Sequence, residues 1–230
     1  TKPPGYSFAA GQYARLGLPG EHDVIWRAYS MVSAPHEDSL EFYGILVPGG
    51  RFTSLVKELK PGAAILIEKQ PYGFMTVNRF EDGEELWMLA TGTGIGPFIS
   101  ILRDPHAWQK FDKLILVHCV RHANEFAYQE QLLQLAKKQP VATTAQLKIV
   151  RTATREATED ATLLSGRITT LLETGELERA VGIPLAAESS RIMLCGNPDM
   201  IEDTRRILHQ RGMRPCRRVL PGQFVTENYW

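Results

Sequence analysis

The sequence has few cysteines and no long apolar run. Its three cysteines, Cys119, Cys195 and Cys216, form no Cys-x-x-Cys pair. That spacing argues against a zinc site, a cysteine-ligated iron–sulfur cluster and a disulfide framework, so no metal is expected. The cysteine usage fits a reducing, cytoplasmic compartment. No apolar stretch approaches the roughly 18 residues that a membrane-spanning helix needs.

An excess of either charge is also missing. The chain carries 26 Lys and Arg against 26 Asp and Glu, so its net charge is +0. A neutral chain gives no global electrostatic support for binding nucleic acid or a membrane surface. Hydrophobic residues make up 43% of 230 residues. That composition and length suit two domains, each with its own core.

The sequence pattern in the first third of the chain predicts strands and turns. One helix is expected at residues 53–59, where Lys60-Pro61-Gly62 ends it. The strand-like segments are bounded by Gly or Pro and cover residues 13–18, 24–29, 40–46 and 63–69. Several short strands with a single helix predict a small antiparallel β-barrel.

From residue 80 onward, apolar strand-like runs alternate with helical patterns. The expected strands are 86–90, 114–120, 147–150 and 191–195, and the expected helices are 97–102, 125–138, 168–174 and 199–210. This alternation predicts an α/β doubly wound parallel sheet with helices on both faces. The acidic segment 80–85 marks the boundary, which gives domains of residues 1–79 and 80–230.

A cation, a flat ring and a hydroxyl stand together in the run Arg27-Ala28-Tyr29-Ser30. The guanidinium suits a diphosphate, the Tyr ring suits a flat heterocycle, and the Ser hydroxyl suits a ring nitrogen. Taken alone, the run also fits an ordinary strand with an exposed Arg and a half-buried Tyr.

Two glycine-rich turns precede expected helices. Gly49-Gly50-Arg51-Phe52-Thr53-Ser54 opens the first, and Thr91-Gly92-Thr93-Gly94-Ile95-Gly96-Pro97 opens the second. Glycines before a helix N-terminus let backbone N–H groups approach an anion such as a diphosphate. A plain capped helix remains the alternative for the first turn. Three alternating glycines favour a ligand-binding role for the second.

Taken in order, these motifs resemble those of ferredoxin–NADP reductases. Leu194-Cys195-Gly196-Asn197-Pro198 and the ending Glu227-Asn228-Tyr229-Trp230 continue the series. The whole chain is similar to the bacterial flavodoxin/ferredoxin–NADP reductase branch. The resemblance implies an FAD-binding antiparallel barrel followed by an NADP-binding domain. The family's first strand lies before the match that begins at Phe8, so the barrel is expected to lack it.

The resemblance also implies which residues hold the FAD. Tyr29, Ser30, Cys195 and Glu227 are expected at the reacting rings, with Glu227 as a proton relay. The tail is expected to return to the flavin, with Tyr229 or Trp230 stacking on it. The expected FAD contacts are Arg27, Ala28, Tyr29, Ser30, Tyr43, Arg51, Phe52, Thr53, Thr93, Tyr229 and Trp230.

A second set of residues is expected to bind NADP. By resemblance Arg121, Arg155 and Arg167 surround the 2′-phosphate, where two or three charge-assisted hydrogen bonds at about 1.5–3 kcal/mol each favour NADP over NAD. A solvated surface charge is the alternative for each arginine. The expected NADP contacts are Gly92, Gly94, Arg121, Thr154, Arg155, Arg167, Cys195, Gly196 and Asn197.

The expected partner is an acidic ferredoxin or flavodoxin. Arg205, Arg206, Arg211, Arg214, Arg217 and Arg218 form a basic cluster in an otherwise neutral chain. Such a cluster suits electrostatic docking of an acidic carrier or is a solvated face. The predicted enzyme is a monomer that moves electrons between NADPH and the carrier. An NADH-dependent flavin or oxygenase reductase, and a flavin subunit inactive outside a complex, are the alternatives.

Overall fold

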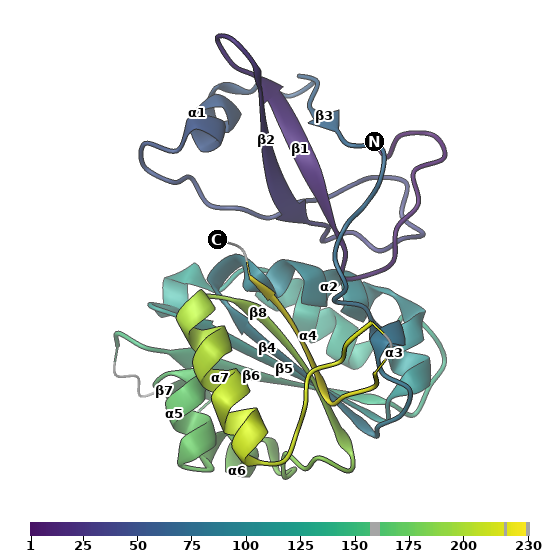
Figure 1. Ribbon diagram of the computed structural model, residues 1–230, viewed down its shortest axis with the longest axis vertical. Coiled ribbons are helices and arrows are strands. Elements are labelled where there is room, and N and C mark those ends of the chain that lie inside the picture. Colours follow the sequence, from purple (N-terminus) through teal and green to yellow (C-terminus); the bar gives the residue numbers. More distant parts are fainter. Residues whose placement is uncertain (157–161, 219, 229–230) are drawn as a thin grey trace.

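The computed structural model describes residues 1–156, 162–218 and 220–228, and it contains two sheets (Figure 1). The first is a three-stranded antiparallel sheet in the order β2-β1-β3. It consists of β1 (Tyr13–Pro19), β2 (Val24–Ser30) and β3 (Leu66–Ile67). Helix α1 (Arg51–Glu58) covers it through the buried Phe52, which packs with Leu16, Leu18 and Ile25.

The antiparallel part has less strand than the sequence predicts. Residues 40–46 make a single isolated bridge, from Phe42 to Met31, so the strand expected there is wrong. The strand expected at 63–69 is reduced to β3. Segment 40–46 instead passes close to β2, since a Cβ on Gly44 would lie 2.7 Å from Cε1 of Tyr29. Packing against that ring takes the place of a continuous ladder.

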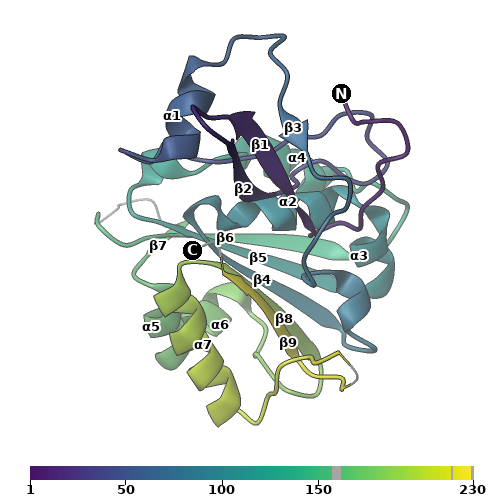
Figure 2. The same cartoon turned by 45° about the horizontal axis from the view of Figure 1, so that its top comes forward.

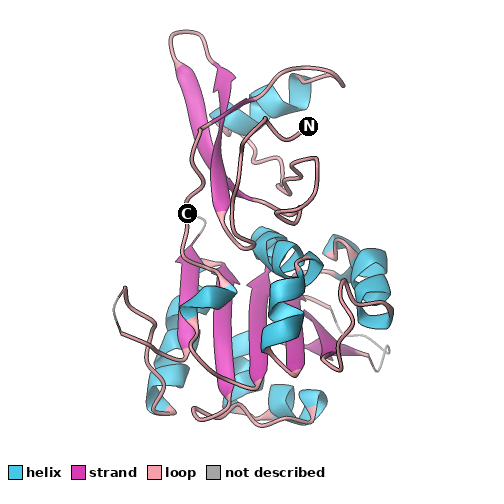
Figure 3. Cartoon of the chain, turned by 90° about the vertical axis from the view of Figure 1, so that its right-hand side faces the viewer, coloured by secondary structure: helices cyan, strands magenta, loops and turns pink. Residues whose placement is uncertain are grey.

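The second sheet is parallel and runs β7-β6-β5-β4-β8-β9. Figure 3 shows its strands running toward the antiparallel part. Together the two sheets confirm the predicted fold class. The strands are β4 (Glu85–Thr91), β5 (Lys113–Val120), β6 (Gln146–Ala153), β7 (Leu163–Ser165), β8 (Ser190–Gly196) and β9 (Phe224–Asn228).

Helices cover both faces of this sheet because its central strands are apolar on both sides. In β4, Leu86 and Met88 enter one core, whereas Trp87 and Leu89 enter the other. One core is covered by α2 (Gly96–Arg103), α3 (Pro105–Lys110) and α4 (Gln129–Lys137), the other by α5 (Ile168–Glu173), α6 (Glu176–Val181) and α7 (Pro198–Gln210). None of the helices within the described ranges is long and apolar enough to cross a membrane.

The helix expected at 125–138 begins later than predicted. Residues Ala123–Glu125 form the short 3₁₀ helix η3, and Tyr128 has a left-handed φ of 61° that interrupts the pattern before Gln129. β7, β9, α3 and α6 were not predicted, because each is short or lies among Gly and Pro residues.

Polar contacts hold the antiparallel part against α2 and α4. The carboxylate of Glu41 accepts from Arg103 Nη1 and from the hydroxyl of Tyr128, both at 2.7 Å. Ser100 Oγ donates to the Ser33 carbonyl at 2.7 Å, fully within the interior. Figure 2 shows the β1–β2 pair lying over α2, with α1 to one side of the pair. These contacts fix the relative position of the two parts, whereas the exact boundary at residues 79 and 80 stays a prediction.

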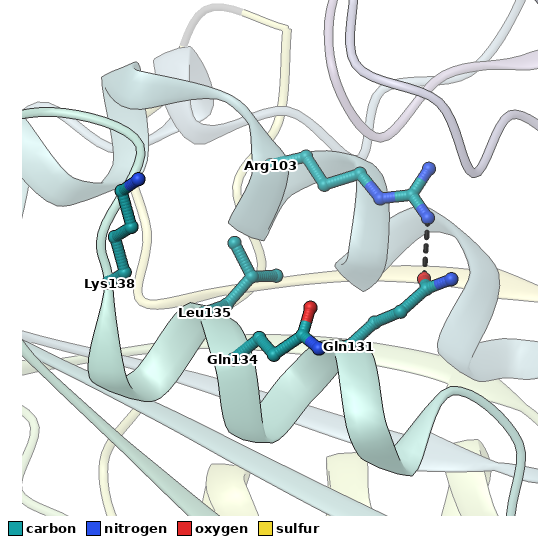
Figure 4. Close-up of a pocket in the computed structure, with 5 residues that line it drawn as sticks. All are labelled: Arg103, Gln131, Gln134, Leu135 and Lys138. Carbon is teal, nitrogen blue, oxygen red and sulfur yellow. Dashed lines mark hydrogen bonds between the residues drawn. The ribbon is translucent and has the colours of Figure 1, made fainter.

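Arg103 is the centre of this contact. It also donates to Gln131 Oε1 at 2.7 Å beside a hollow of about 310 Å³ lined by Gln134, Leu135 and Lys138 (Figure 4). The guanidinium is already occupied by these partners and by the Val32 carbonyl at 3.4 Å. We therefore assign the hollow no ligand.

Replacing Arg103 tests the strength of the contact. Arg103→Leu leaves the half-buried Glu41 with Tyr128 as its remaining partner, so we expect a loss of ~2 kcal/mol in the free energy of unfolding. The urea midpoint measures this loss. Arg205→Leu, which breaks an exposed pair with Glu202, is the control and should cost less than ~1 kcal/mol. Equal effects of the two changes would contradict the assignment.

Candidate active site

The strand order of the parallel sheet has its switch point between β4 and β8. Strands β4 to β7 extend the sheet in one direction, and the chain then returns to place β8 on the other side of β4. In open α/β sheets, ligands bind in the crevice outside the carboxyl ends of the strands at such a point. The carboxyl ends of β4 and β8 are Thr91 and Gly196, so the turn Thr91–Pro97 and the motif Leu194–Pro198 meet there.

Glycine allows the two turns to touch. A Cβ on Gly94 would lie 2.3 Å from the Cys195 carbonyl oxygen, and one on Gly196 would lie 2.1 Å from Thr91 Oγ1. No side chain fits at these distances. The Thr91 hydroxyl accepts from the Asn197 backbone N–H at 2.7 Å. The 3₁₀ turn η2 (Gly92–Ile95), which contains Thr93, is therefore fixed against the start of α7.

Asn197 also caps α7. Its side-chain oxygen accepts from the N–H groups of Asp199 and Met200 at 2.8 and 3.2 Å. The amide oxygen is therefore engaged in the helix N-terminus, which lies beside the Gly92–Ile95 turn.

His118 was missed by the sequence reasoning. This buried residue of β5 lies with Nε2 2.9 Å from the Gly92 carbonyl oxygen. Burial lowers its pKa to about 4, so at neutral pH it is uncharged and its Nε2–H donates to the carbonyl. The imidazole holds the exposed, left-handed Gly92 (φ 54°) in place. The signal that could have indicated His118 is a single His within an apolar strand that ends beside Arg121.

The predicted arginines lie at the carboxyl ends of β5 and β6. The Arg155 N–H donates to the Arg121 carbonyl at 2.9 Å, and the Thr154 N–H donates to the Val120 carbonyl at 3.0 Å. Arg167 follows Gly166, whose N–H donates to the Ala153 carbonyl at 2.9 Å. All three arginines are exposed, and within residues 1–156, 162–218 and 220–228 none forms an ion pair. Three exposed guanidinium groups at one edge, without an ion pair among the described residues, suit an anionic group.

On the antiparallel part, Ser30 and Tyr29 lie at the end of β2. Ser30 is buried and faces the start of α2, since a Cβ on Gly96 would be 3.9 Å from Ser30 Cβ. Tyr29 packs against Phe52 with ring centroids 5.6 Å apart. Ala28 and Arg27 are exposed, and the Arg27 guanidinium donates to the neighbouring Trp26 carbonyl.

The turn before α1 is held by Thr53. Its buried hydroxyl accepts from the Val47 N–H at 3.2 Å and contacts the carbonyls of Val47 and Gly50. Arg51 is exposed and lies 3.5 Å from Asp23. Gly50, the N-cap, supplies no capping side chain, so the first N–H groups of α1 receive no side-chain cap.

Two further predicted residues pack against the core: Tyr43 is partly buried and Cys195 fully so. Tyr43 contacts Tyr128 edge-on, with ring centroids 5.5 Å apart. Cys195 is fully buried in the core beneath α2. Their roles toward a cofactor stay predictions, and Tyr229 and Trp230 lie outside the described residues.

Glu227 lies in a pocket of about 560 Å³ between β1 and β9. The pocket is also lined by Gln12, Tyr13, Phe74 and Asn228. Oε2 of Glu227 is buried and has no hydrogen-bond partner among the described residues. Burial raises the pKa of this carboxyl to about 7. It can therefore hold or release a proton near neutral pH.

These features define a class of protein. A doubly wound sheet with glycine turns at its switch point, next to an antiparallel domain, is the arrangement of a nucleotide-binding oxidoreductase. A family model described as an oxidoreductase NAD-binding domain matches residues 88–206.

Proteins of similar sequence identify the family within this class. The chain is 40% identical to the flavodoxin/ferredoxin–NADP reductase of Buchnera aphidicola over 225 residues, covering 97% of this chain and 88% of the relative. It is 39% identical to that of Escherichia coli, covering 99% and 90%. A crystal structure of a ferredoxin NADP⁺ reductase from Neisseria gonorrhoeae with bound FAD and NADP matches with a TM-score of 0.92 and 38% identity, covering 100% and 90%. The chain belongs to the flavodoxin/ferredoxin–NADP reductase family.

The buried carboxyl of Glu227 predicts a pH-dependent stability. Below about pH 4.5 the group is protonated in both states and contributes nothing. As the pH rises to about 7 the unfolded state ionises first, so stability falls, by at most ~3 kcal/mol. We expect Glu227→Gln to be more stable than the wild type at pH 8 and similar to it near pH 4.5.

Urea midpoints at the two pH values measure the difference. Glu173→Gln, which changes an exposed carboxyl at the end of α5, serves as the control and should leave the pH dependence unchanged. A Glu227→Gln variant that loses the same stability as the wild type between the two pH values would show that Glu227 is not the group responsible.

Proposed function

We propose that this chain binds FAD on residues 1–79 and NADPH on residues 80–230, and passes electrons from NADPH to ferredoxin or flavodoxin. One observation carries the proposal. The Ser30 end of β2 packs against Gly96, so the motif expected at the flavin adjoins the turn expected at the NADP. Hydride transfer requires reacting atoms to approach to about 3–3.5 Å, and the adjacency of the two motifs supports such an approach.

The residues suit FAD in the order in which the chain presents them. Ser30 and Tyr29 end β2, Gly44 lies against the Tyr29 ring, the exposed Ile45 and Leu46 follow, and α1 begins without a capping side chain. An apolar stretch that ends at a helix N-terminus suits a ring system joined to a diphosphate. Arg27 and Arg51 add positive charge in the same segments.

The FAD that these residues would hold would supply hydride acceptance and one-electron release, chemistry that no amino-acid side chain supplies. The chain's own residues orient and protect this reaction. The buried side chain of Ser30 lies at the meeting point of the two parts. Glu227 holds a proton near neutral pH in the adjacent pocket. His118 stays neutral and supports the Gly92 turn from beneath.

Specificity for NADPH follows from the exposed arginines. Arg121 and Arg155 are joined through their backbones, so both guanidinium groups start from one edge of the crevice. A 2′-phosphate recruited there gains charge-assisted hydrogen bonds that NADH lacks. Arg167 approaches the same edge from the next strand connection.

The function is tested by reconstituting the purified chain with FAD and adding NADPH without oxygen. We expect the flavin absorbance near ~450 nm to bleach with NADPH and far more slowly with NADH, because the arginines favour the phosphorylated nucleotide. Ferricyanide then reports steady-state turnover. The proposal is ruled out if the chain takes up no FAD, or if its flavin stays oxidised after NADPH is added.

The nucleotide preference is tested by Arg121→Ala and Arg155→Ala. Each should raise the KM for NADPH about tenfold or more and change NADH turnover little, because one charged hydrogen bond is worth about 1.5–3 kcal/mol. Arg206→Ala, which removes an arginine paired with Asp203 on α7, is the control. Equal losses with NADPH and NADH would assign these arginines a structural role.

A further inference from the structure

An exposed apolar and basic surface is built from two segments far apart in sequence. Phe74 is 75% exposed and Leu220 is 56% exposed, which sets them apart from the buried rings and aliphatic side chains of the parallel domain. We define the Phe74–Leu220 surface by these two residues together with Arg79, Arg214, Arg217 and Arg218. Exposed apolar groups with a charged rim are typical of protein interaction sites.

A chain of contacts joins the two segments. The Arg79 guanidinium lies 5.8 Å from the centroid of the Phe74 ring. The same guanidinium donates to the Arg217 carbonyl at 2.7 Å. Arg217 and Leu220 pair across a tight turn. Phe74 and Leu220 therefore belong to one surface, and the Arg79 side chain fixes their relative position.

The arginines of this surface differ from those of α7. Arg205 and Arg206 pair with Glu202 and Asp203 one helical turn away, and Arg211 pairs with Glu178. The side chains of Arg214, Arg217 and Arg218 form no ion pair within the described part of the chain. Glu81 lies in the same region, since the charges of Glu81 and Arg79 both shift the pKa of the Cys216 thiol. Glu81 therefore adds one negative charge here. The net local charge remains positive.

The surface adjoins the candidate active site. Phe74 lines the same pocket as Glu227 and Tyr13, and Tyr13 pairs with Ser30 across the β1–β2 ladder. A protein seated on Phe74 would lie beside the ring system that the proposed function puts at Ser30. Transfer of single electrons between proteins requires such a short separation.

We propose that the Phe74–Leu220 surface, rather than the arginine face of α7, docks the acidic one-electron carrier protein. The inference rests on the proposed function. Its physical basis is charge complementarity between the unpaired arginines and a carrier rich in Asp and Glu, with Phe74 and Leu220 as the apolar centre. Arg205 and Arg206 are already paired with carboxylates of their own helix, so they offer the carrier less.

The test compares two charge reversals of equal size. Arg217→Glu with Arg218→Glu changes the proposed surface, and Arg205→Glu with Arg206→Glu changes α7. The probe is a purified acidic flavodoxin, with NADPH as donor and cytochrome c as final acceptor, and NADPH–ferricyanide turnover reports the enzyme without a carrier. We expect the first variant to raise the flavodoxin concentration for half-maximal rate about tenfold or more at low salt. The second variant should stay within about twofold of the wild type, and both should keep ferricyanide turnover.

Two further measurements complete the experiment: the dependence on salt concentration and the effect of replacing an apolar residue. Raising ionic strength from about 0.01 M to about 0.15 M shortens the screening length from about 30 to about 8 Å, so the effect of the first variant should shrink. Phe74→Ser should weaken calorimetric flavodoxin binding at both salt concentrations, whereas Leu133→Ser, which changes an exposed leucine of α4, should not.

The outcomes separate the two proposals. A wild type without ferricyanide turnover rejects the proposed function. Normal ferricyanide turnover with no flavodoxin binding overturns the docking surface together with the carrier step of the proposed function. Normal ferricyanide turnover with equal flavodoxin dependence in all variants, or with a larger effect of the α7 reversal, overturns the docking surface alone.

Discussion

The structure depends on the backbone contact between the end of β8 and the turn after β4. Gly94 and Gly196 have no space for a Cβ because each lies against main-chain or hydroxyl atoms of the other segment. That contact fixes where α2 and α7 begin, and α2 in turn carries Gly96 to Ser30 and Arg103 to Glu41. The contact of Gly94 and Gly196 therefore positions both α2 and α7, and His118 supports it through the Gly92 carbonyl.

Two carboxylates near the domain junction have opposite surroundings and so serve different purposes. Glu41 receives hydrogen bonds from Arg103 and Tyr128, which makes it a connector between the two parts. Glu227 has a buried oxygen without a partner among the described residues, and burial raises its pKa to about 7. A satisfied polar group stabilises the fold, whereas an unsatisfied one in a pocket is available to a ligand or a proton.

The sequence predicts most of the parallel domain because its pattern is local. Apolar runs such as Leu86–Ala90, followed by a glycine turn and a helix, locate the crevice and place Thr93, Arg121 and Asn197 at its edge. Contacts between residues far apart in the sequence cannot be predicted in this way, as with Glu41 and Arg103 or His118 and Gly92. The left-handed φ of Tyr128, after which α4 begins, is not predicted either. Thr53, expected at a diphosphate, has its hydroxyl within the Val47–Gly50 turn. The pairing of Arg205 and Arg206 within α7 was visible in principle, since their acidic partners lie three residues earlier.

In the proposed enzyme, the two nucleotide sites face each other closely enough for direct transfer of a hydride. The most direct measurement is the rate of flavin reduction in a single anaerobic turnover, comparing NADPH with NADPH that carries deuterium at the transferred position. Direct transfer predicts that the deuterated nucleotide reduces the flavin severalfold more slowly, because the bond to that atom breaks in the step observed. Identical rates, at nucleotide concentrations that saturate binding, would contradict it.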